Sequence, residues 1–187
     1  MHATSLIVSI TAGFALSACA AAPPKASEVT RHPTVVGDAA FTERVGAALA
    51  LLASRAPEAH ELVVTYVGRV GQSARSGMNV HADPPTLELA DVTVFYSVTW
   101  CAASIVHDAQ HAKLYTDYAR DHDGPVPAEI WTGQAAEQAC MRAQHAALLD
   151  IGAPERESTY LAGLDGTHHD VDGDGEYTWA DYWLRNW

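Results

Sequence analysis

The sequence predicts an α+β fold that is mostly helical, with a small sheet and an acidic loop near the C-terminus. Apolar side chains recur at helical spacing in three long stretches, residues 38–55, 97–119 and 127–150. Residues 86–95 come close to alternating apolar and polar side chains, which is typical of a strand. Because the helical stretches are long and the strand signal is short, helices should dominate.

The N-terminus has the features of an export signal. An apolar run at residues 6–16 is too short to cross a membrane, which takes about twenty apolar residues. Residues 16–19, Leu-Ser-Ala-Cys, resemble the lipobox of bacterial lipoproteins, although no Lys or Arg precedes the run. The resemblance implies a signal peptide at residues 1–18 and a diacylated Cys19. Ala20 stands where an Asp often marks inner-membrane retention, so the resemblance implies a cell-envelope protein anchored in the outer membrane and facing the periplasm.

Residues 19–37 are rich in Ala and Pro and have no apolar period, which predicts a mobile tether. The remaining residues, 38–187, are enough for a single domain with its own core. The chain has a formal net charge of −12, which argues against nucleic acid and anionic lipid as partners. We therefore expect contact with the membrane only through the N-terminal lipid.

The predicted elements follow from local patterns. Helix 38–55 has Asp38 as its N-cap and carries apolar residues at helical spacing, namely Phe41, Val45, Leu49 and Leu52. Residues 61–70 fit either a helix or a strand, because helical spacing and β-branched side chains occur together. Residues 71–85 contain Gly, Ser, Asn and a double proline, which favours a loop or a short edge segment.

Two further helices are predicted in the second half of the chain. Helix 97–119 should stop at the Gly and Pro residues within 121–127, and helix 127–150 should be terminated by Gly152. The second of these helices is rich in alanine, and such small side chains allow a neighbouring helix to approach closely.

The first of these helices carries His107 and His111, four residues apart. At about 100° per residue, this spacing places both imidazoles on one face of the helix, one turn apart. Two nitrogens so placed can converge on one zinc ion at about 2.1 Å. Asp108 lies between them, where zinc peptidases keep their general base.

The segment HDAQH on one helix, followed by Glu137 on a later helix, resembles the zincin metallopeptidases of the gluzincin type. The resemblance implies a zincin-like domain in which zinc is held by His107, His111 and Glu137, with Asp108 as the catalytic base. Peptide or protein would be the substrate, laid against an edge strand for which residues 86–95 are the candidate. The family has Glu at the position of Asp108, so the base here is one methylene shorter.

The third zinc ligand stays open between Glu137 and Asp117. Asp117 lies six residues after His111, the position that metzincin-like peptidases use. Those enzymes need a glycine at the intervening turn, where this chain has Leu114, and this favours Glu137. His122 and His145 are further candidates that spacing does not exclude.

After export, Cys101 and Cys140 are the remaining cysteines. An oxidising compartment favours a disulfide between them, and two buried thiols are the alternative.

The segment DVDGDGEYTWAD at residues 170–181 matches a calcium-binding loop. Its carboxylates alternate and a glycine occupies the sixth position, which resembles an EF-hand and, more closely, a dockerin half-hand. The resemblance implies calcium ligands at Asp170, Asp172, Asp174, Glu176, Thr178 and Asp181.

Four aromatic residues cluster at the C-terminus, Trp179, Tyr182, Trp183 and Trp187. They either pack on the domain or bind another envelope protein. The sequence therefore predicts a lipid-anchored zinc metallopeptidase with structural calcium. The alternative is a non-catalytic calcium-binding lipoprotein that captures a protein partner through these aromatic residues.

Overall fold

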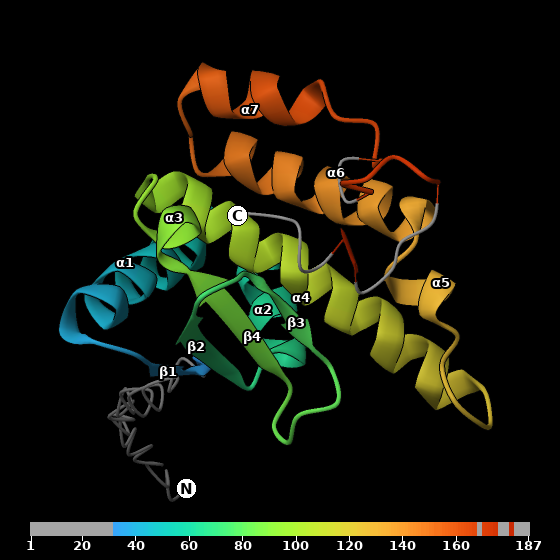
Figure 1. Ribbon diagram of the computed structural model, residues 1–187. Coiled ribbons are helices and arrows are strands. Elements are labelled where there is room, and N and C mark those ends of the chain that lie inside the picture. Colours follow the sequence, from blue (N-terminus) through green and yellow to red (C-terminus); the bar gives the residue numbers. More distant parts are fainter. Residues whose placement is uncertain (1–31, 168–169, 176–179, 182–187) are drawn as a thin grey trace, which may run out of the picture. The chain divides into compact units, whose positions relative to one another are not determined.

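The computed structural model describes residues 32–167, 170–175 and 180–181 (Figure 1). The predicted signal and Cys19 lie outside these residues. Along the chain, the elements are β1 (Thr34–Val36), α1 (Ala39–Arg55), α2 (Pro57–Tyr66), β2 (Arg69–Ser73), β3 (Gly77–Asn79), β4 (Thr86–Ala90), α3 (Asp91–Val94), α4 (Val98–Asp121), α5 (Ala128–Trp131), α6 (Gln134–Asp150) and α7 (Glu155–Ala162). The described chain is α+β and mostly helical, as predicted. None of its described helices has the length and apolar character needed to cross a membrane.

The sheet has four strands in the order β1-β2-β4-β3. Strands β1, β2 and β4 are parallel, whereas β3 is antiparallel to β4 and forms one edge. Val70 of β2 pairs with Leu87 of β4, and both side chains are fully buried. Residues 61–70, which fitted either a helix or a strand, contain the end of α2 and the start of β2.

Three predictions about the strands were wrong. Residues 34–36 form β1 instead of belonging to the tether, because Val35 packs against the core. The strand predicted at 86–95 ends at Ala90, where Asp91 begins the short helix α3 and the side-chain amide of Gln72 donates to its carboxylate at 2.8 Å. Strand β4 is also an interior strand, so it is not the edge strand expected to hold a substrate.

The helix predicted at 127–150 is divided into α5 and α6 by Gly133, whose extended backbone precedes the first residue of α6. Gly152 ends this region with a φ of +70°, which is readily adopted only by glycine. Helix α4 agrees with its prediction to within two residues at its C-terminal end. Its N-cap Ser97 accepts the N–H of Trp100 at 2.8 Å.

Helix α4 is the centre of the fold. One side of it packs with α1, α2 and the sheet around a large apolar cluster that includes Phe41, Leu52 and Ile105. Helix α6 runs alongside α4, and α7 lies against α6 (Figure 1). Ala103 on α4 is fully buried in a cluster with Met141 and Leu148 of α6, and its small side chain lets the two helices approach closely.

A buried carboxylate fastens α7 to the start of α4. Glu157 is 1% exposed, and its two oxygens accept hydrogen bonds from Ser97 Oγ at 2.9 Å and Thr99 Oγ1 at 2.7 Å. The first turn of α4 carries positive partial charge from its unpaired N–H groups, which also favours a carboxylate there.

We predict that Glu157→Ala lowers the free energy of unfolding by about 2–4 kcal/mol, because two hydrogen bonds to a charged group are lost from a buried position. Urea denaturation measures the change. Glu155→Ala is the matched control, since Glu155 lies in the same first turn of α7 and is exposed. Equal stabilities of the two variants would contradict the assignment.

Candidate metal centre

Helices α4 and α6 bring four potential ligand side chains together. His107 and His111 lie one turn apart on α4, and their Nε2 atoms are 3.1 Å apart. On α6, Glu137 and Cys140 are also one turn apart, and both are buried. The His107 and His111 pair on α4 thus faces the Glu137 and Cys140 pair on α6.

The distances between these side chains match those around a small cation. Glu137 Oε2 lies 3.3 Å from His107 Nε2, and Glu137 Oε1 lies 3.4 Å from His111 Nε2. For a tetrahedral zinc ion with bonds of about 2.0–2.1 Å, ligand atoms are about 3.3–3.4 Å apart. The two imidazoles and the carboxylate are therefore already spaced as ligands of one ion.

The Cys140 thiol lies close to the same two histidines. The ligand atoms of His107, His111 and Cys140 all lie within 4.8 Å of one another. Burial is the main cause that raises the pKa of Cys140, and the negative charges of Glu137 and Asp108 raise it further. His107, His111 and Cys140 thus form a candidate buried metal site.

The Nδ1 atoms of both histidines have hydrogen-bond partners. His111 Nδ1 lies 2.6 Å from the carbonyl oxygen of Trp131, and His107 Nδ1 lies 3.0 Å from Gln144 Oε1. A carbonyl oxygen only accepts hydrogen bonds, so Nδ1 of each ring carries a proton and donates it. In the neutral ring, Nε2 then carries no proton and presents its lone pair. Two Nε2 lone pairs 3.1 Å apart repel unless a proton or a metal ion lies between them. In metal sites, the histidine nitrogen that does not bind the ion makes the same kind of hydrogen bond.

The site is enclosed and attracts positive charge. The side chains of His107, His111 and Glu137 are only 16%, 10% and 8% exposed. Burial lowers the pKa of His107, but the hydrogen bond and charge of Glu137, the charge of Asp108 and the hydrogen bond to Gln144 together raise it above its usual value. The potential that retains a proton there also favours a cation.

Asp108 follows His107 on α4 and is half-buried. Its negative charge acts on both His107 and Cys140, which places it within electrostatic reach of the site. Its role as a catalytic base stays a prediction.

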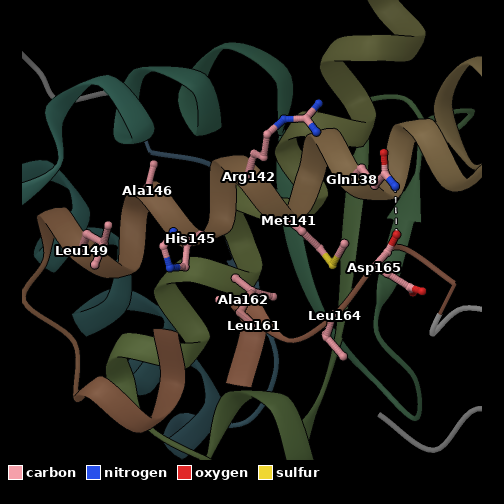
Figure 2. A pocket seen from close by; sticks show the side chains of 10 residues that line it. All are labelled: Gln138, Met141, Arg142, His145, Ala146, Leu149, Leu161, Ala162, Leu164 and Asp165. Atoms are coloured by element: carbon pink, nitrogen blue, oxygen red, sulfur yellow. Dashed lines mark hydrogen bonds between the residues drawn. The ribbon is translucent and has the colours of Figure 1, made fainter. Parts of the chain in front are cut away.

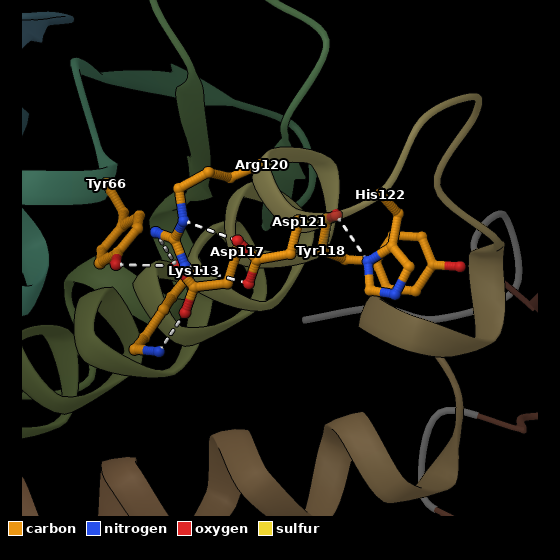
Figure 3. A network of polar contacts seen from close by, with 7 residues as sticks. All are labelled: Tyr66, Lys113, Asp117, Tyr118, Arg120, Asp121 and His122. Carbon is orange, nitrogen blue, oxygen red and sulfur yellow. Dashed lines mark hydrogen bonds and ion pairs between the residues drawn. The ribbon is translucent and has the colours of Figure 1, made fainter.

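Asp117, the alternative third ligand, is engaged elsewhere (Figure 3). Its carboxylate accepts hydrogen bonds from Lys113, from Tyr66 Oη at 3.2 Å and from Arg120 Nη1 at 3.1 Å. These contacts lower its pKa, with the hydrogen bond from Lys113 as the largest cause. Helix α4 also continues through Leu114, so the chain does not change direction between His111 and Asp117. The geometry therefore favours Glu137 over Asp117.

Neither of the other two candidate histidines lies among these ligands. His122 stacks on Tyr118 and contacts its carbonyl oxygen at 3.1 Å. His145 lines a separate cavity of about 470 Å³ between α6 and α7 (Figure 2). That cavity is bordered by Met141, Arg142 and Leu161, among others.

The disulfide considered between Cys101 and Cys140 is not formed in the structure, where both cysteines are buried free thiols. Burial raises the pKa of Cys101 to about 12, and Arg44 opposes this effect. Cys101 packs in the large apolar cluster, whereas Cys140 belongs to the metal-ligating group.

The acidic segment near the C-terminus brings carboxylates together. Oxygen atoms of Asp170, Asp172 and Asp174 all lie within 4.8 Å of one another. Gly173 and Gly175 have φ values of +76° and +87°, so the tight turn requires glycine at both positions.

Asp181, the last residue of the predicted calcium loop, is buried and accepts the N–H of Val171 at 2.9 Å. The N–H of Asp174 lowers the pKa of Asp172, but desolvation and the charges of Asp174, Asp181 and Asp170 outweigh this effect and raise it. Glu176, Thr178 and the four C-terminal aromatic residues lie outside the described residues.

Two contributors were missed by sequence reasoning. Gln144 lies seven residues after Glu137 and four after Cys140, so its position on the same face of α6 could have been noticed. The other group is the backbone carbonyl oxygen of Trp131, which contacts His111. A backbone contact does not depend on the residue type, so the sequence does not reveal it.

Comparisons with protein families, with curated proteins and with solved structures find no match to this chain. The site is therefore interpreted from its own geometry.

We predict that Gln144→Ala weakens zinc binding about 10–100-fold, because the His107 ring loses the partner that fixes its orientation and tautomer. Competition with a chromophoric chelator gives the affinity. The control is His145→Ala, which changes the next residue on α6 but faces the separate cavity. An unchanged affinity in Gln144→Ala would show that this support is dispensable.

Proposed function

We propose that this chain is a zinc-dependent hydrolase of the peptidase type, with zinc held by His107, His111 and Glu137. The observation that carries the proposal is the approach of the Glu137 oxygens to both Nε2 atoms, at 3.3 and 3.4 Å. The Nδ1 atom of each histidine is at hydrogen-bond distance from an oxygen of Gln144 or Trp131. Two histidines and one glutamate are a common ligand set of catalytic zinc.

The donor atoms suit zinc better than harder or larger cations. Imidazole nitrogen is a ligand of zinc and other transition metals, whereas magnesium and calcium take oxygen. Bound zinc would polarise a water molecule for attack on a carbonyl carbon. We assign the role of general base, which takes the proton from that water, to Asp108, because its negative charge acts on both His107 and Cys140.

The sheet offers a place for an extended substrate. Strand β3 is an edge strand among the described residues, and it contacts α4, the helix that carries the histidines. A peptide can add to such an edge through its backbone hydrogen bonds. We therefore place the substrate along β3, in the role that residues 86–95 were expected to fill.

We further propose that the protein is exported, anchored through lipid on Cys19, and stabilised by calcium at residues 170–181. The sequence of the lipobox-like segment supports the anchor. The grouped oxygens of Asp170, Asp172 and Asp174 and the two left-handed glycines support the calcium loop.

Zinc content tests the ligand set. Protein purified without chelators should contain about one zinc per chain by elemental mass spectrometry, and His107→Ala and Glu137→Ala should retain less zinc than the parent after the same dialysis, because each substitution removes one ligand. Asp117→Ala is the matched control, since it removes a carboxylate from α4 that is paired elsewhere. Full zinc in Glu137→Ala would remove Glu137 from the ligand set.

Hydrolysis tests Asp108. At equal zinc content, Asp108→Asn should cleave a fluorogenic peptide library about 10²–10⁴-fold more slowly, because the amide cannot accept the proton of water. Asp121→Asn, at the exposed end of α4, is the control. If Asp108→Asn keeps the parent's rate, another group is the base or no such catalysis occurs.

Calcium binding is measurable by calorimetric titration. We expect one site with a Kd of about 10⁻⁴–10⁻³ M, as in extracellular modules, and loss of the signal in Asp172→Asn. Asp150→Asn, which removes an exposed carboxylate at the end of α6, should bind calcium like the parent. Parent-like titration of Asp172→Asn would exclude this loop as the site.

A further inference from the structure

We propose that the Cys140 thiolate is a fourth ligand of the same ion, so that the resting site is a closed tetrahedron of two nitrogens, one oxygen and one sulfur. The inference rests on the metal site of the proposed function and states how that site is regulated: the sulfur occupies the position that a hydrolytic water needs.

Helical register supports this assignment. Cys140 follows Glu137 by three residues on α6, so both side chains lie on the face turned toward α4. Cys140 and Glu137 are both buried, and each lies near both histidines: the sulfur within 4.8 Å of their ligand nitrogens, and the carboxylate oxygens 3.3 and 3.4 Å from the two Nε2 atoms.

Charge balance supports it as well. A divalent ion with two neutral imidazoles and one carboxylate keeps a net positive charge, which is costly in a buried site. A thiolate cancels that charge, and a thiol that coordinates zinc is deprotonated outright, with its proton released to solvent.

The closed site has a consequence for catalysis. Structural zinc sites have four protein ligands, whereas catalytic sites keep one position for water. With sulfur bound, His107, His111, Glu137 and Cys140 fill all four positions. The resting protein is then latent, and hydrolysis requires Cys140 to leave the ion.

Cobalt(II) tests the sulfur ligand, because a cobalt–thiolate bond gives a sulfur-to-metal charge-transfer band in the near ultraviolet. The full-length parent loaded with cobalt should show this band, and Cys140→Ser should lose it while still binding one cobalt. Cys101→Ser is the matched control, since Cys101 is also buried but lies in the apolar cluster. Cys19 is common to all three proteins.

Activity tests the latency. At equal zinc content, Cys140→Ser should cleave the peptide library at least about tenfold faster than the parent, because a water position opens. An equal or lower rate in zinc-loaded Cys140→Ser overturns the latency.

X-ray absorption of the zinc-loaded parent needs no variant and should show one sulfur at about 2.3 Å. Cobalt binding without the band, or a zinc shell without sulfur, overturns the ligand assignment and leaves the proposed function standing. Failure of the parent to bind either metal overturns both.

Discussion

The close packing of α6 against α4 is the constraint on which the site depends. His107 and His111 are fixed relative to each other by helix geometry alone, but Glu137, Cys140 and Gln144 reach them only because α6 lies at this distance and in this register. Buried alanines on both helices permit the approach. A larger side chain at Ala103, which packs with Met141 and Leu148 of α6, would separate the helices and so disperse the ligands.

The sequence predicted those parts of the site that are local in the chain. The His107 and His111 pair required only the period of a helix, and α4 was predicted almost to its ends. Glu137 required a family resemblance, because no local rule says which residue of a later helix will face the histidines. The break at Gly133 was not predicted, although it creates α5, whose Trp131 carbonyl holds His111.

The strand predicted at residues 86–95 was too long, because its alternating pattern continues into a helical turn. Val92 and Val94 continue an alternating pattern, yet they belong to a helical turn in which Val94 is buried and Val92 is 59% exposed. Two-residue spacing over so short a segment does not separate a strand from one helical turn. The identity of the edge strand depends on how four strands pair across the sheet, and such pairing is not encoded locally.

Residues 165–166, which precede the acidic loop, pack on the first turns of α6. Gln138, the residue after Glu137, donates from its side-chain amide to the carbonyl oxygen of Asp165 at 2.9 Å. A Cβ at Gly166 would lie 2.9 Å from Gln138 Cγ and 3.1 Å from the carbonyl oxygen of Gln134, so the segment runs close against α6 there. The chain just before the acidic loop is therefore held against the turn of α6 that carries Glu137.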